Sequence, residues 1–151
     1  MKKLALVLGA VLLLTPAPLR SQVWSAPQME VWKTVETMWE LSAKGDIEGE
    51  MAYCDDALTI WLQGAPLPSD KSSFRKWATF GSKNEQTPVQ ELKPITITVL
   101  PECAIVHYYV TSVTVSVPTG KVEMGSLKIT DVFRKKGDRW FWIGGHNSVV
   151  P

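Results

Sequence analysis

The sequence predicts an α+β domain in which three N-terminal helices pack on a strongly curved antiparallel sheet. Up to Phe80 apolar residues recur at helical spacing, whereas from Pro94 onward apolar and polar residues alternate with a period of two. An order of helices followed by a run of antiparallel strands is typical of folds whose helices lie on one face of a sheet. Segments such as 103–117 are much longer than the usual strand of about five or six residues, so the sheet must coil or bulge.

The first helix is expected to begin at Ser25 and to end before Gly45. Ser25 and Gln28 have the S-x-x-Q spacing of a capping box, and Pro27 falls in the first turn, where its missing N–H costs nothing. Asp46 is then expected to cap a shorter second helix. The residues that recur at helical spacing are Met29, Trp32, Val35, Met38, Trp39 and Ser42 in the first helix and Ile47, Met51 and Tyr53 in the second.

A first strand is expected at residues 58–62, before Gly64 and two prolines break the chain. A third helix should start at Ser69 or Asp70 and carry Phe74, Trp77, Ala78 and Phe80, and residues 81–87 are expected to form a polar connector. Four strands are expected to follow, at residues 94–100, 103–117, 121–134 and 139–149.

Residues 1–21 have the composition of a secretory signal peptide. Two lysines precede an apolar run at 4–14, and a proline-rich segment of small residues follows. A run this short cannot span a bilayer, which takes about 20 residues. We therefore expect a secreted or periplasmic protein without a lasting membrane anchor, made of one domain over residues 22–151.

Charge and cysteine content exclude some classes of function. Removal of residues 1–21 would leave a net charge of about −2, without the basic surface of a nucleic-acid-binding protein. Cys54 and Cys103 are expected as two separate thiols, with a disulfide between them as the alternative. No histidine or cysteine spacing typical of a metal site occurs in the sequence, so neither a metal nor a cofactor is expected.

Residues 32–151 resemble the nuclear transport factor 2-like superfamily, in particular its SnoaL-like or ketosteroid-isomerase-like bacterial branch. The resemblance lies in the order of the elements and in three local signatures. These are Gly45-Asp46, the segment Tyr53-Cys54-Asp55-Asp56-Ala57, and the hairpin from Thr130-Asp131-Val132-Phe133 to Trp140-Phe141-Trp142-Ile143 with its trailing His146 and Ser148. The resemblance implies a cone-shaped fold whose sheet wraps the first helix and leaves a pocket between the helices and the concave face.

The mechanism of ketosteroid isomerases does not carry over to this chain. The position of their catalytic carboxylate falls on Trp61, which has no exchangeable proton with a useful pKa. Asp55 and Asp56, where the second helix gives way to the first strand, are expected to be solvated turn formers.

Two histidines, one tyrosine and one aspartate are the candidate catalytic residues. A period of two places His107 on one strand face with Tyr109, and His146 on one face with Trp142 and Ser148. If both rows face the pocket, a histidine could act as a general base while Tyr109 or Ser148 polarises a carbonyl or hydroxyl group. The alternative for each histidine is a hydrogen-bonded core residue.

Asp131 has two possible orientations. An even-numbered hairpin loop places it on the face of Trp142 and His146, where an Asp131–His146 dyad would be the best acid–base pair, and an odd-numbered loop turns it toward solvent.

The sequence thus favours an exported domain whose aromatic-lined pocket holds a small apolar or amphipathic molecule. The expected ligand-binding residues are Trp61, His107, Trp142, Ser148 and Tyr53. The alternative function is a lyase or isomerase that uses His146 with Asp131 or Tyr109 on a carbonyl- or hydroxyl-bearing substrate. A homodimer is also expected, through an outer sheet face formed by Val106, Tyr108 and Val110 or by the residues that alternate with them.

Overall fold

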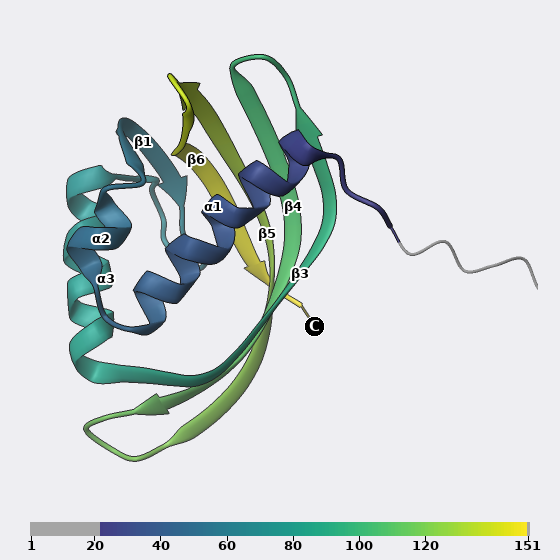
Figure 1. The fold of residues 1–151 in the computed structure, drawn as a ribbon. Coiled ribbons are helices and arrows are strands. Elements are labelled where there is room, and N and C mark those ends of the chain that lie inside the picture. The colour runs from purple at the N-terminus through teal and green to yellow at the C-terminus, as the bar shows by residue number, and fades with distance from the viewer. Residues whose placement is uncertain (1–21, 151) are drawn as a thin grey trace, which may run out of the picture.

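The computed structural model describes residues 22–150, in which three helices lie against one face of a six-stranded mixed sheet (Figure 1). The predicted signal peptide of residues 1–21 lies outside the described residues. The elements are α1 (Ala26–Ala43), α2 (Ile47–Met51), β1 (Cys54–Trp61), β2 (Ser69–Asp70), α3 (Lys71–Asn84), β3 (Glu85–Val99), β4 (Cys103–Ser116), β5 (Val122–Lys136) and β6 (Arg139–Val149). No helix within residues 22–150 is long and apolar enough to cross a membrane.

The helices begin at the polar residues that the sequence indicated. The Gln28 side chain accepts a hydrogen bond from the Ser25 backbone N–H at 2.9 Å, as in a capping box. Asp46 accepts from the backbone of Gly49, and Asp70 accepts from the backbone of Ser73. These caps satisfy backbone N–H groups that have no partner inside the helix.

The strand order is β2-β1-β6-β5-β4-β3, and β1 runs parallel to β6. The expectation of a wholly antiparallel sheet is therefore wrong, because β1 pairs with β6 in parallel on one side, besides its antiparallel pairing with β2 on the other. β2 and β3 form two open edges. The long strands bend beneath α1 (Figure 1), but the sheet is not curled into a cone.

β3 starts at Glu85, well before the predicted start at Pro94, and α3 extends to Asn84. The predicted polar connector at 81–87 is thus the end of a helix and the start of a strand. Residues 85–93 pair with β4, yet most of them are exposed or only half-buried. Without a buried face, this half of the strand has no apolar alternation in its sequence.

The core fills the space between the helices and the sheet. On β4 the buried row is Val106, Tyr108 and Val110, and the alternate residues, including His107 and Tyr109, point to the opposite face. The first of the two rows considered for a dimer interface is therefore core. Other core residues are Val31, Trp32, Val35, Leu58, Ile60, Phe133, Trp140 and Trp142.

A β-bulge at Ile143 reverses the faces of the last strand. Phe133 pairs with Trp142, but the next residue, Val132, pairs with Gly144, so Ile143 is an extra residue on β6. Before the bulge, Trp140 and Trp142 point toward the helices. After it the parity changes, and His146, paired with Thr130, lies on the outer face.

Within the described residues Cys54 and Cys103 are both free thiols, as expected. Cys54 is buried, and burial raises the pKa of its thiol to about 12.

Candidate functional site

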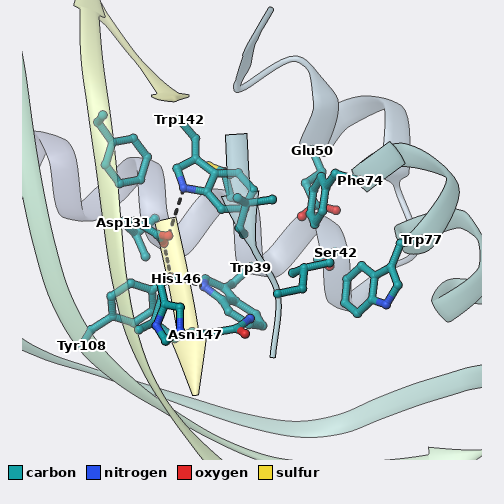
Figure 2. Close-up of a pocket in the computed structure, with 16 residues that line it drawn as sticks. Trp39, Ser42, Glu50, Phe74, Trp77, Tyr108, Asp131, Trp142, His146 and Asn147 are labelled. Atoms are coloured by element: carbon teal, nitrogen blue, oxygen red, sulfur yellow. Dashed lines mark hydrogen bonds between the residues drawn. The ribbon is translucent and has the colours of Figure 1, made fainter. Parts of the chain in front are cut away.

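A cavity of about 80 Å³ lies between the helices and the inner face of the sheet (Figure 2). Its walls come from α1, α2, α3 and four strands, and they are mostly apolar or aromatic. The lining residues are Val35, Met38, Trp39, Ser42, Glu50, Ile60, Leu62, Phe74, Trp77, Tyr108, Ile129, Asp131, Phe133, Trp142, His146 and Asn147.

Asp131 is the polar centre on the sheet side of the cavity. Its carboxyl group is buried and accepts two hydrogen bonds, from the Tyr108 hydroxyl at 2.6 Å and from the Trp142 indole N–H at 2.9 Å. The Trp39 indole in turn donates to the Tyr108 oxygen at 2.8 Å. Helix α1 and strands β4, β5 and β6 are thus joined by one hydrogen-bonded network (Figure 2).

The donors in this network fix its direction. An indole N–H can only donate, so the Tyr108 oxygen accepts from Trp39, and its own proton is directed toward Asp131. Both hydrogen bonds at Asp131 therefore favour its ionised form. Burial acts more strongly in the opposite direction and raises the pKa of Asp131 to about 7.

Gly145 makes room for this arrangement. It pairs with Asp131 across β5 and β6, and a Cβ atom at Gly145 would overlap Asp131 Oδ1. The added Cβ atom would also lie 3.3 Å from the Trp142 indole nitrogen. The hydrogen bond between Trp142 and Asp131 thus passes over a residue without a side chain.

Glu50 is the polar centre on the helix side. It lies on α2 with 6% of its surface exposed, and its Oε2 atom has no hydrogen-bond partner within residues 22–150. Burial raises its pKa to about 7, although a hydrogen bond from the Ser42 side chain lowers the pKa in part. Figure 2 shows Glu50 beside Ser42 and Phe74, away from the Asp131 network.

These two carboxyl groups give the cavity its chemistry. Each changes charge near neutral pH, and each can accept a hydrogen bond from a bound molecule when it is ionised. Among the residues that the structure describes, the lining holds neither lysine nor arginine, and residues 22–150 contain no cluster of metal-ligating side chains. The site can therefore hold a molecule that donates a hydrogen bond, or exchange a proton with it.

Several solved structures have the same fold. A ketosteroid isomerase-like protein from Erwinia carotovora atroseptica SCRI1043 has a TM-score of 0.74 at 12% identity, over 85% of this chain and 99% of that one. A conserved protein from Planctomyces limnophilus DSM 3776 has a TM-score of 0.74 at 17% identity, over 83% and 98%. The chain has the nuclear transport factor 2-like fold. A nuclear transport factor 2-like protein of unknown function in nutrient uptake from Rhodospirillum rubrum ATCC 11170 has a TM-score of 0.68 at 17% identity, over 80% and 98%.

No protein-family model and no curated protein sequence matches the chain. At these identities the solved structures establish the nuclear transport factor 2-like fold and no activity, because this fold serves many unrelated functions.

Only some of the sequence-predicted site residues meet in the cavity. Asp131 and Trp142 both line it, and they are hydrogen-bonded to each other. His146 borders the cavity, but its pairing with Thr130 directs its exposed side chain to the outer face. The predicted Asp131–His146 dyad is therefore wrong, because the bulge at Ile143 places the two side chains on opposite faces of the sheet.

The other predicted residues lie elsewhere in the nuclear transport factor 2-like fold. His107, Tyr109 and Ser148 lie with His146 around a shallow depression of the outer face, where His107 Nδ1 is 2.9 Å from the Thr130 hydroxyl. Tyr53 is half-buried outside the cavity, with the Arg139 guanidinium 5.3 Å from its ring.

Trp61 is exposed, and its indole donates to the Ala65 carbonyl. The cavity side of this segment is formed by its neighbours Ile60 and Leu62, which also lack an exchangeable proton. No carboxylate therefore stands where the resemblance to ketosteroid isomerases would place one.

Asp55 also departs from the sequence-based expectation of a solvated turn residue. It is buried and paired with Arg134 at 2.6 Å and Lys136 at 2.7 Å. Burial raises its pKa, but the hydrogen bonds from Lys136, the Ala57 N–H and Arg134 outweigh burial and hold the pKa well below its usual value. Asp56 is exposed, as expected.

Sequence reasoning missed Glu50 and Tyr108. Glu50 follows Ile47 by three residues, so both lie on one face of α2, and this spacing is the signal that could have found it. Tyr108 alternates with the outward-facing His107 and Tyr109, and only the direction of the sheet decides which row is buried.

Proposed function

We propose that the cavity binds a small, mostly apolar molecule that carries a hydrogen-bond donor. The observation that carries this proposal is the unpartnered Oε2 atom of the buried Glu50 in an aromatic-lined cavity. A buried acceptor without a partner costs about 1 to 3 kcal/mol, so its retention favours a ligand that satisfies it.

The walls support a ligand with an apolar body. Phe74 meets Trp142 edge to face, with ring centroids 5.2 Å apart, and stacks on Trp77 at 5.8 Å. Trp77 is 56% exposed, at the side of the cavity that opens to solvent. Ligand sites usually combine such apolar walls with a few polar groups that orient the ligand.

A second function, acid–base catalysis in a lyase or isomerase, is favoured by one specific observation. Asp131 and Glu50 both have a pKa raised to about 7, where a carboxyl group can accept and return a proton. In this function Glu50 and Asp131 would be the acid–base groups, in place of His146 with Asp131 or Tyr109. A reaction that needs only a proton transfer at a carbonyl- or hydroxyl-bearing carbon would fit this site.

We also propose an exported homodimer that assembles through the outer face of the sheet. The composition of residues 1–21 supports export. Ile95 and Tyr109, each 40% exposed, border the shallow depression, and together with Trp61 they give the outer face exposed apolar area, which supports self-association.

The proposed function can be tested by fragment binding followed through tryptophan indole signals. Mature protein labelled with ¹⁵N would be titrated with alcohols, amines and ketones of three to six heavy atoms (about the size that the cavity admits). Bound fragments should shift the indole N–H resonances of Trp39 and Trp142, which are hydrogen-bonded at the cavity. Trp140, buried away from the cavity, is the internal reference.

Ser42→Phe is the matched variant, because Ser42 lines the cavity from the half-buried side of α1 and a phenyl group there would fill it. This variant should abolish the shifts while His107→Gln, on the outer face, retains them. Absence of binding by every fragment, or identical shifts in Ser42→Phe, would refute a binding cavity.

A further inference from the structure

We propose that the ligand of this cavity is a small organic ammonium ion, held between the Glu50 carboxylate and the surrounding aromatic rings. This inference rests on the proposed function and names the class of its ligand. Three observations support it: the charges around Glu50, the aromatic lining of the cavity and the volume of the cavity.

The charge balance around Glu50 differs from that around Asp55, a buried acid on β1. Asp55 is paired with two cationic side chains, Arg134 and Lys136. Glu50 is buried to a similar degree, but no cation lies against it within residues 22–150, and its Oε2 atom has no partner. Because a buried carboxylate is stable only when paired, an incoming cation would supply what Asp55 already has.

The walls suit a cation better than they suit an arbitrary donor. Six aromatic rings line the cavity with Glu50, from Trp39, Phe74, Trp77, Tyr108, Phe133 and Trp142. The faces of aromatic rings attract ammonium groups, most strongly those of tryptophan and when water is excluded. Cages of aromatic rings are a known means of binding alkylated ammonium groups.

The size of the cavity restricts the ion. The volume of the cavity is about 80 Å³, which leaves room for a small group only. The enclosed part of the ligand is therefore an ammonium head with short alkyl substituents, and a longer body would leave past the exposed Trp77. Isopropylammonium is a suitable probe, and isopropanol is its neutral counterpart of the same shape.

The raised pKa of Glu50 supports the same ligand. Burial raises the pKa of Glu50 to about 7, and a bound ammonium ion would favour the ionised carboxylate, so binding should strengthen from pH 6 to pH 8. The titratable groups that face the cavity from other elements are Tyr108 on β4, Asp131 on β5 and His146 at the border on β6. Cys54, on β1, lies close to Glu50, with its thiol directed at the Glu50 carbonyl.

The test is a calorimetric or NMR titration of the mature wild-type protein with isopropylammonium chloride and with isopropanol at pH 8. We expect isopropylammonium to bind at least about tenfold more tightly, the ratio that a single charge-assisted hydrogen bond gives. Glu50→Gln, which keeps the shape but removes the charge, should bring the two affinities to within about twofold. The matched control is Glu48→Gln, an exposed acid on the same helix that should leave the ratio unchanged.

Two outcomes would overturn the inference, and they separate it from the proposed function. Equal or tighter binding of isopropanol to the wild type would refute a cation site while leaving a binding cavity in place. Binding of neither probe, together with no indole shift by any fragment, would refute both. The comparison of the two probes on the wild type decides the matter even if Glu50→Gln fails to fold.

Discussion

The indole N–H of Trp142 donates to Asp131 Oδ1 at 2.9 Å across the backbone of Gly145. The hydrogen bond links two residues that are diagonal neighbours on β5 and β6, and it depends on a position without a Cβ atom. The polar centre of the cavity is therefore built by the backbone as much as by the carboxylate itself.

Gly145→Ala should destabilise the protein by about 1 to 3 kcal/mol, the usual cost of forcing a group into a packed site. The new methyl group would overlap Asp131 Oδ1 and lie 2.8 Å from the Thr130 carbonyl oxygen. Urea denaturation measures the change. Gly125→Ala is the control on β5, where the added methyl group meets no atom within 4 Å, and it should not destabilise the protein. Equal stability of the two variants would contradict the crowding at Gly145.

The free energy of unfolding should fall as the pH rises from about 4.5 to 8. Glu50 has an ordinary pKa of 4.5 in the unfolded chain and a pKa of about 7 in the fold, so the folded state binds more protons in this range. The stability that its protonated form contributes is fully present below pH 4.5, the pKa in the unfolded chain. It is lost as the pH rises through about 7, the pKa in the fold. Asp131 acts in the same direction.

Glu50→Gln should remove about 2 to 3 kcal/mol of this pH dependence, as measured by urea denaturation at pH 5 and pH 8. Glu48→Gln should retain it. Asp55 acts in the opposite direction, because its lowered pKa contributes stability that is present above its ordinary 3.8 and lost as the pH falls below that. A wild-type stability that does not change between pH 5 and pH 8 would contradict the raised pKa values.

Trp140→Ala should destabilise the protein by about 3 to 5 kcal/mol, as expected for loss of a buried large aromatic side chain. Trp140 is 3% exposed, and the Lys135 ammonium lies 5.2 Å from its ring. Lys135 also pairs with Glu30 on α1, so this end of the hairpin is tied to the first helix. Trp61→Ala, at a half-exposed ring, should cost about 1 kcal/mol, and a similar loss at both positions in thermal melts would count against this packing.

Light scattering of the mature protein should give twice the monomer mass. Tyr109→Arg should shift the mass to that of the monomer, because Tyr109 lies 40% exposed in the outer apolar surface and a charge there would be buried in an interface. Val23, far more exposed, supplies the control variant Val23→Arg, which should remain dimeric. A monomeric wild type at tens of micromolar would refute the dimer.

His146→Gln should change the free energy of unfolding by less than about 1 kcal/mol, as for other exposed positions. Its side chain lies on the outer face, so fragment binding in the cavity should also be unchanged. Asp131→Asn is the contrasting variant, since it changes the acceptor of the Tyr108 and Trp142 hydrogen bonds. A loss of binding in His146→Gln equal to that in Asp131→Asn would restore His146 to the site.

The helices and most strands could be predicted because their signals are local. Ser25, Asp46 and Asp70 cap helices through bonds to residues three positions away, and alternation over β4 and β5 follows from one buried face. The parallel pairing of β1 with β6 could not be predicted, because it joins the start of the domain to its end and leaves no local pattern.

The site was only half predictable for a similar reason. Asp131 and Trp142 could be named because an acid and aromatic residues alternate inside a hairpin. The hairpin loop of Gly137 and Asp138 has the even length that places Asp131 beside Trp142, but the extra residue Ile143 then turns His146 away. A bulge depends on tertiary packing, and one extra residue reverses every later side chain on the strand.

Glu50 and Asp131 are two carboxyl groups of one cavity, and burial raises the pKa of each to about 7. ¹³C NMR of the labelled side-chain carboxyl groups tests this most directly, with assignments from Glu50→Gln and Asp131→Asn. We expect both groups to titrate near pH 7 in the free protein, and a fragment that shifts the Trp142 indole resonance to shift both titrations as well. Titration of both groups near pH 4, unchanged by the fragment, would contradict this expectation.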